Sequence, residues 1–155
     1  MATIKLRVDG KPVAIKTDDP NMPLLYALRG DLGMKTPHFG CGLAQCGVCT
    51  VLLDGEPVRS CVLPLAEAKG RKVTTLAGLG TPEKPHPIQA AFIEEQVPQC
   101  GYCLDGWVMT AVAFLDKNPK ATDKEMREAF AGVKCRCGTH VSILRALKRA
   151  QALMA

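Results

Sequence analysis

The chain has 155 residues, of which 47% are hydrophobic and 23% are charged, and its formal net charge is +5. This composition excludes a disordered protein, and no apolar run reaches the roughly 18 to 20 residues that a membrane span needs. The basic residues are dispersed except at Arg145, Lys148 and Arg149, a pattern that does not indicate a nucleic-acid-binding protein.

The first 77 residues predict a small sheet with one helix. Residues 3–8 alternate apolar and polar side chains, Asp9-Gly10 is a two-residue hairpin turn, and the alternation resumes over residues 13–15. Leucines at helical spacing predict a short helix over residues 24–28. Further strands are expected at residues 50–53, 57–62 and 72–76.

Glycines and prolines crowd residues 78–87, which is the strongest compositional break in the chain. We place a domain boundary there, so that residues 1–77 and 78–155 form two domains. Beyond the break, helices are predicted at residues 88–95, 107–115, 122–130 and 141–153, the third with a capping box. The predicted fold class is α+β, with a sheet domain followed by a compact four-helix unit.

Four of the eight cysteines have the C-x4-C-x2-C…C spacing of plant-type ferredoxins, which hold a 2Fe-2S cluster by four thiolates. They are Cys41, Cys46, Cys49 and Cys61. Reduced cysteines in a chain without an export signal more often bind metal than form disulfides. Glycines among them allow backbone N–H groups to approach an anionic cluster where a Cβ would interfere. These glycines are Gly40, Gly42 and Gly47.

The other four cysteines form two close pairs, each just before a predicted helix: Cys100 with Cys103, and Cys135 with Cys137. Two helix N-termini can therefore converge on one anionic metal centre, which their dipoles favour. Zinc held by four cysteines is the alternative for either set, because zinc sites also use C-x2-C pairs. A C-x1-C pair is an awkward zinc chelate, and a ferredoxin-type set in the same short chain favours iron at both.

Five motifs resemble the iron–sulfur subunit of the xanthine oxidase family of molybdenum hydroxylases, and the match covers essentially the whole chain. They are Phe-Gly-Cys-Gly-Leu-Ala-Gln-Cys-Gly-Val-Cys-Thr-Val at 39–51, Arg-Ser-Cys at 59–61, His-Pro-Ile-Gln at 86–89, Gln-Cys-Gly-Tyr-Cys at 99–103 and Cys-Arg-Cys-Gly at 135–138. The resemblance implies a β-grasp ferredoxin-like domain followed by a four-helix bundle, in agreement with the predicted elements.

The resemblance also implies the role of each cysteine set. The second set would hold an inner 2Fe-2S cluster beside a molybdopterin cytosine dinucleotide, which a separate large subunit binds. Gln99 and Cys137 match the positions that contact the pterin. The first set would hold an outer cluster that delivers electrons to a cytochrome c or flavoprotein acceptor. The chain would then be the non-catalytic electron-transfer subunit of a molybdenum oxidoreductase.

The chain contains no serine, histidine and carboxylate arrangement, phosphate loop or flavin motif, so substrate choice would lie in the large subunit. The loop motifs most resemble the small subunits of bacterial aldehyde and isoquinoline dehydrogenases, and an aldehyde-oxidising enzyme is the first expectation. One alternative is the small subunit of an N-heterocycle hydroxylase of the isoquinoline or nicotinate type. Another is a free-standing ferredoxin, which would leave the helical half without a partner.

The N-terminal residues lack the basic and apolar regions of a secretory signal. The chain is therefore expected to remain cytoplasmic, or to reach the periplasmic face of the inner membrane when it is exported together with a signal-bearing large subunit.

Three positions depart from the family pattern without removing a ligand: Ala44, the Leu104-Asp105 pair and His140. Asp105 is expected to cap the N-terminus of the following helix. The histidines are expected to be surface or packing residues, because four cysteines complete each cluster. Residues expected to pack the helical half are Tyr102, Trp107, Met109 and Met126.

Overall fold

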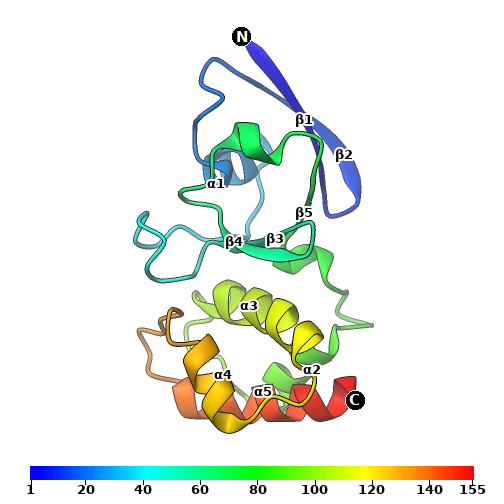
Figure 1. Ribbon diagram of the computed structural model, residues 1–155, viewed down its shortest axis with the longest axis vertical. Coiled ribbons are helices and arrows are strands. Elements are labelled where there is room, and N and C mark those ends of the chain that lie inside the picture. Colours follow the sequence, from blue (N-terminus) through cyan, green and yellow to red (C-terminus); the bar gives the residue numbers. More distant parts are fainter.

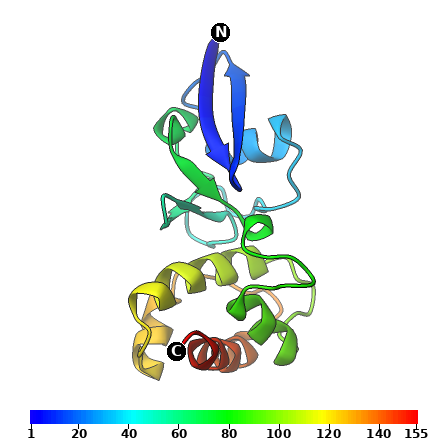
Figure 2. The ribbon, with the colours of Figure 1, turned by 90° about the vertical axis from the view of Figure 1, so that its right-hand side faces the viewer.

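The computed structural model describes the whole chain, Met1 to Ala155. A sheet half and a helical half are stacked end to end, with the N-terminus at the far end of the sheet half (Figure 1). A view turned by 90° shows the chain leaving the sheet half through β5 and looping outward before it enters the helices (Figure 2). None of the helices combines the length and the apolar character that crossing a membrane requires.

Five strands form one sheet in the order β2-β1-β5-β3-β4, in which β1 and β5 are parallel and the other neighbours antiparallel. The strands are β1 (Ala2–Val8), β2 (Lys11–Thr17), β3 (Thr50–Leu53), β4 (Glu56–Arg59) and β5 (Lys72–Thr74). The predicted strands are confirmed, but β4 and β5 end earlier than expected. The chain turns after Arg59, whose carbonyl accepts from the Val62 N–H, and after Thr74 it turns to meet Asp9.

Both predicted hairpin turns are present, and each has two residues with positive φ. In the first, φ is 49° at Asp9 and 79° at Gly10, the backbone geometry that matches strand twist in a two-residue turn. The Asp9 carboxylate also accepts the backbone N–H and the hydroxyl of buried Thr75, both at 2.7 Å. The first turn therefore holds the chain that leads to the helical half.

One small apolar core fills the sheet half. It lies between the sheet and a helical turn made of α1 (Leu24–Tyr26) and the π-helical segment η1 (Ala27–Asp31), with the 3-10 segment η2 (Leu65–Ala68) on another side. The π-helical geometry and η2 are not expected from the sequence. Core residues at the helical turn are Leu24, Ala27 and Leu28.

The second half contains the four expected helices: α2 (Pro87–Glu94), α3 (Leu104–Lys117), α4 (Asp123–Ala129) and α5 (His140–Met154). The capping box of α4 is present as predicted, with Thr122 and Glu125 satisfying each other's backbone N–H groups. At α2, the ring of His86 plays the capping role by accepting the Ile88 N–H at 3.3 Å. Helix α3 begins three residues earlier than predicted.

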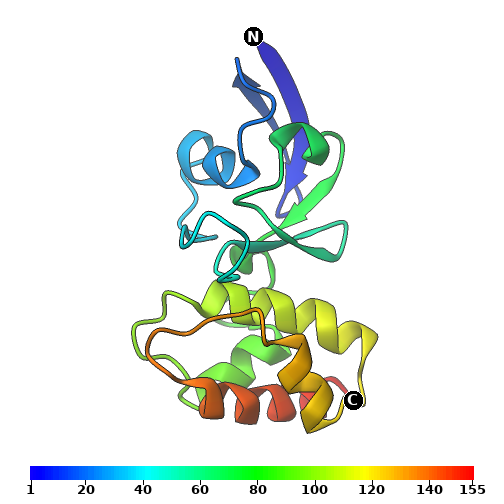
Figure 3. The same ribbon diagram turned by 60° about the vertical axis from the view of Figure 1, so that its left-hand side comes forward.

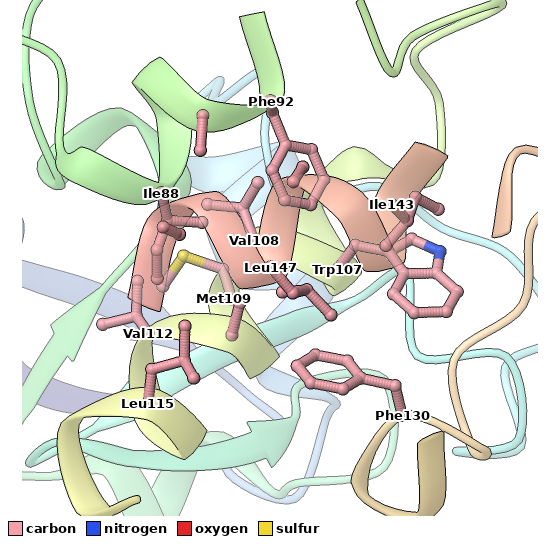
Figure 4. Packing of buried hydrophobic residues seen from close by; sticks show 14 of the residues in the cluster. Ile88, Phe92, Trp107, Val108, Met109, Val112, Leu115, Phe130, Ile143 and Leu147 are labelled. Atoms are coloured by element: carbon pink, nitrogen blue, oxygen red, sulfur yellow. The ribbon is translucent and has the colours of Figure 1, made fainter. Parts of the chain in front are cut away.

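A second, larger apolar core fills the helical half (Figure 4). The Trp107 ring stacks on Phe130 with centroids 5.6 Å apart, and the sulfurs of Met109 and Met126 belong to fully buried side chains. The packing role expected for these residues is confirmed. Residues labelled in Figure 4 from the other helices include Ile88, Phe92, Ile143 and Leu147.

Strand β3 joins the two halves because all four of its residues are buried. Successive side chains of a strand point to opposite faces. Val51 and Leu53 accordingly belong to the sheet core, and Leu52 belongs to the helical core. Helix α3 lies directly beneath β3 and β4 (Figure 3). The 3-10 segment η3 (Leu76–Gly78) spans the expected boundary between residues 77 and 78, which stays a prediction.

Candidate metal centres

The loop between η1 and β3 curls around the sulfur atoms of two cysteines. The backbone N–H groups of Leu43, Gln45 and Cys46 each lie 3.3 Å from the Sγ of Cys41. The Cys41 N–H lies 3.4 Å from the Sγ of Cys46. Successive N–H groups that point inward form a concave site for an anion, and thiolates bound to iron are such anions.

Positive φ angles produce this curvature. They occur at Gly42 (68°) and Gly47 (83°), as expected from the sequence, and also at Ala44 (58°). An L-residue other than glycine pays about 1 to 2 kcal/mol for this conformation, which gives a physical reason why glycine suits position 44. At Gly40, a Cβ would lie 2.6 Å from Val48 Cγ1 and 2.8 Å from the Cys46 sulfur. Only a glycine therefore fits at position 40, beside the Cys46 sulfur.

The β3–β4 hairpin supplies the two buried cysteines of the first set. Cys49 precedes β3 and Cys61 follows β4, and both thiols pack with Leu25. The Ser60 hydroxyl donates to the Cys49 carbonyl at 2.6 Å, which ties the two ends of the hairpin together. The Cys49 thiol lies near Cys61 and Cys46, and Cys46 lies next to Cys41, so the structure brings the four expected cysteines together.

The second set lies where the start of α3 meets the segment before α5. Cys103 is the N-cap residue of α3, and Cys100 lies in the loop before it. The thiols pair across the two segments: Cys100 contacts Cys137, and Cys103 contacts Cys135. The hydroxyl of Thr139, the N-cap residue of α5, lies 3.2 Å from the Cys135 sulfur. The start of α3 and the segment before α5 thus lie side by side, with the four cysteines between them.

Each set contains thiols with a lowered pKa as well as thiols with a raised pKa. The N–H of Leu43 lowers the pKa of Cys41 to about 7, whereas burial raises the pKa of Cys49 to about 11. Burial raises the pKa of Cys103 to about 12. Burial also acts to raise the pKa of Cys135, but its hydrogen bonds with Thr139 bring that pKa down to about 7. The buried thiols need a bound cation before they lose their protons.

Neither set is arranged around one point. No three histidine, cysteine, aspartate or glutamate side chains converge where they could hold a single metal ion. A structural zinc ion needs four ligands around one centre, whereas a 2Fe-2S cluster distributes its four cysteines over two irons. Both sets, with their paired thiols and the inward N–H groups of the first, fit a 2Fe-2S cluster.

Comparison with known proteins finds two 2Fe-2S domains in this chain. A 2Fe-2S iron-sulfur cluster binding domain matches residues 6–77, and a second 2Fe-2S binding domain matches residues 75–148. One subunit of the nicotinate dehydrogenase of Pseudomonas putida is 54% identical over 148 residues, which cover 96% of this chain and 94% of that protein. The chain belongs to the family of small iron–sulfur subunits of molybdenum-dependent dehydrogenases.

One further relative and one solved structure extend the comparison. The alpha subunit of isoquinoline 1-oxidoreductase from Brevundimonas diminuta is 46% identical over 147 residues, covering 95% of this chain and 96% of that protein. The crystal structure of the aldehyde oxidoreductase from Desulfovibrio desulfuricans superposes with a TM-score of 0.93 at 36% identity. That match covers 99% of this chain but 17% of the longer aldehyde oxidoreductase chain. The α+β fold expected for a small iron–sulfur subunit is confirmed.

In this iron–sulfur subunit the two halves meet along one surface, here called the seam. On the side of the sheet half it consists of the loop of residues 38–48 and the β3–β4 hairpin. On the side of the helical half it consists of α3 and residues 132–135. The Lys134 N–H donates to the Cys46 carbonyl at 2.9 Å. Gly106 of α3 packs on the backbone of Gly47, where a Cβ would lie 2.7 Å from the Gly47 carbonyl carbon. At the rim, Lys117 pairs with Glu56 at 2.6 Å.

The structure corrects two sequence-based expectations at the seam. Asp105 does not cap α3; it lies in the first turn, is 2% exposed, and its carboxylate is 2.8 Å from His38 Nδ1. Tyr102 does not pack the helical core; it is 49% exposed and stacks on His38 with ring centroids 4.3 Å apart. The contacting residues lie more than 60 positions apart in sequence, so no local pattern could have identified them.

His140 is exposed and meets the Trp107 ring edge-on at 5.6 Å, a packing role as expected. Gln99 is exposed beside Cys100, whose thiol lies close to that of Cys137. The pterin contact implied for Gln99 and Cys137 stays a prediction.

Proposed function

We propose that Cys41, Cys46, Cys49 and Cys61 hold the outer 2Fe-2S cluster of this electron-transfer subunit. We assign the inner cluster to the second set, Cys100, Cys103, Cys135 and Cys137. The support is the pairing of four thiols at each place, together with the inward N–H groups around Cys41. When bound, such clusters take up and release single electrons.

The chain itself supplies a short bridge between the two ligand sets. From the Cys46 sulfur, covalent bonds lead to its carbonyl oxygen, and one hydrogen bond of 2.9 Å crosses the seam to the Lys134 N–H. Lys134 is bonded directly to Cys135 of the second set. A dehydrogenase removes two electrons from its substrate at once, so two one-electron sites in series allow them to leave singly. The single observation that carries this relay is the Lys134–Cys46 hydrogen bond.

The exposed ends of the two sites indicate the direction of flow that we propose. Cys100 and Gln99 are exposed at the helical end, and we propose that a large subunit covers them and holds a molybdopterin cytosine dinucleotide there. At the outer loop, Cys41 is exposed and Leu43 is 66% exposed, so an acceptor such as a cytochrome c or flavoprotein subunit could approach closely. The compartment would be that of the assembled complex, in the cytoplasm or at the periplasmic face of the inner membrane.

The proposal of a large partner subunit is supported by the length of the aldehyde oxidoreductase from Desulfovibrio desulfuricans. The region equivalent to this chain makes up 17% of that protein's single chain. In an assembly of separate subunits, the remaining part would have to be provided by a partner. A free-standing ferredoxin would lack it.

The ligand assignment predicts about four iron atoms and four acid-labile sulfides per chain. Reduction should produce two distinguishable EPR signals, because one set lies in a loop under a sheet and the other between two helix starts. The measurement is iron and sulfide analysis of the purified complex, followed by EPR of the dithionite-reduced sample. Two iron atoms per chain would contradict the assignment, and zinc without sulfide would restore the zinc alternative.

For the substrate we propose an aromatic N-heterocycle, with an aldehyde as the second candidate. The dehydrogenases named for nicotinate and isoquinoline are 54% and 46% identical over nearly complete subunits, whereas the aldehyde oxidoreductase is 36% identical. The aldehyde stays the second candidate because the aldehyde oxidoreductase is itself 36% identical to this chain.

The substrate proposal is tested on the complex that co-purifies with this chain. Adding nicotinate or isoquinoline without an acceptor should bleach the visible absorption of the clusters, while benzaldehyde should leave it unchanged. The opposite pattern would favour the aldehyde prediction.

A further inference from the structure

Three residues outside both proposed ligand sets connect the outer loop with the start of α3. His38 lies in the loop before Cys41, and Tyr102 and Asp105 flank Cys103. The rings of His38 and Tyr102 are stacked with an interplanar angle of 19°. The Tyr102 hydroxyl donates to the Phe39 carbonyl at 2.6 Å. Residues just before Cys41 of the first set are thus held by residues next to Cys103 of the second set.

The His38 ring makes two polar contacts across the seam through one atom. Its Nδ1 lies 3.0 Å from the Tyr102 carbonyl oxygen and 2.8 Å from Asp105 Oδ2. Both partners are acceptors, so Nδ1 carries the proton. The bond to the carbonyl is the better aligned one, because Asp105 Oδ2 makes no hydrogen bond of good geometry. The contact with Asp105 is therefore mainly electrostatic.

The Asp105 carboxylate is buried against the segment that contains His38. Its side chain is 3% exposed, and besides the imidazole it lies near the backbone N–H of His38 and the charge of Arg29. Burying a carboxylate without a partner is unfavourable, and the contact with His38 offsets part of that cost. An apolar residue at this place would pack at no such cost. The position of the Asp105 carboxylate is thus explained by its contact with the loop that contains His38.

We propose that His38, Tyr102 and Asp105 are positioning residues that fix the orientation of the outer cluster loop relative to Cys103, and with it the geometry of electron transfer between the clusters. The inference rests on the proposed ligand sets. The Lys134–Cys46 hydrogen bond and the Gly47–Gly106 contact hold neighbouring backbone positions of one loop. Both of these contacts lie at the Cys46–Gly47 end of the loop. The contacts of His38 and Phe39 with Tyr102 hold its opposite end, before Cys41.

The test uses the assembled enzyme with both clusters present and compares three variants. Tyr102→Phe removes the hydroxyl bonded to Phe39 while keeping the ring, and His38→Ala removes the stack and both polar contacts. Tyr26→Phe is the matched control, because Tyr26 is the only other tyrosine and is similarly exposed at 53%. The readout is the spin–spin interaction between the two reduced clusters, seen in low-temperature EPR as splitting or as faster relaxation.

Tyr102→Phe should weaken the interaction, His38→Ala should abolish it or change it further, and Tyr26→Phe should leave it as in the parent enzyme. A role in stability alone would lower the unfolding temperature without moving this interaction. An unchanged interaction in Tyr102→Phe and His38→Ala at full iron content overturns the proposal. If His38→Ala loses iron, Tyr102→Phe decides by the same criterion. A parent enzyme with one cluster would instead refute the ligand assignment.

Discussion

Replacing Cys49 by serine should remove the outer cluster, leave the inner cluster in place and abolish turnover with the natural acceptor. Cys49 is 1% exposed beneath the β3–β4 hairpin, and burial already raises the pKa of its thiol to about 11. A serine hydroxyl there does not provide the thiolate that iron requires. Iron per chain should fall from about four atoms to about two. The substrate should still reduce the remaining cluster, because that cluster is nearer to the large subunit in the proposed arrangement.

The reciprocal variant, Cys137→Ser, is the control for this prediction. It should remove the inner EPR signal, keep the outer one and stop reduction of the chain by substrate altogether. Iron analysis and EPR of both variants in the assembled enzyme provide the measurement. Loss of both clusters from Cys49→Ser would show that the two halves do not hold their clusters independently.

Replacing Gly106 by alanine should separate the two halves at the seam. The added Cβ would overlap the Gly47 carbonyl oxygen and lie 3.1 Å from Val48 Cα. These atoms belong to the backbone of the loop between Cys46 and Cys49, so no side chain can move aside. Overpacking of this kind costs about 1 to 3 kcal/mol, and here it pushes on the loop that holds the outer cluster. We expect a lower unfolding temperature and partial loss of iron.

Gly132→Ala is the matched control for the seam. Its Cβ would have only the Arg59 guanidinium nearby, at 3.8 Å, which is ordinary contact distance. This variant should unfold within a few degrees of the parent protein and keep about four iron atoms. Equal stability and iron content of the Gly106→Ala and Gly132→Ala variants would contradict close packing at Gly106.

The sequence alone predicts those parts of the structure that depend on neighbouring residues. Strand β3 has its predicted bounds because Thr50 and Val51 are β-branched, two leucines follow, and the run ends in a turn of Asp54 and Gly55. Helix α4 is predicted with its capping residues because the capping box is a four-residue pattern. The cysteine sets are likewise predicted from their spacing, and the structure brings the members of each set together.

The remaining features depend on contacts between distant segments. Aspartate is a common capping residue and Asp105 lies near the start of a helix, but burial beside His38 gives it a different role. Tyr102 is expected to pack the helical core, yet it stacks on a loop from the other half. Strand β5 stops at Thr74 because the next residue bonds to the Asp9 turn, which is 66 positions away in sequence. Propensity cannot predict such partners, because it describes a residue and its neighbours only.

The two-sided burial of β3 limits how this protein can vary. Most strands of a small sheet have a solvent face that tolerates substitution, whereas every side chain of Thr50–Leu53 faces a packed surface. One face of the strand is matched to the sheet core, and the other is matched to α3. A ferredoxin-like half taken from another protein would therefore bring a β3 surface that does not fit this α3. Electrons can cross between the halves, but the halves cannot be exchanged between proteins as modules unless the strand and the helix change together.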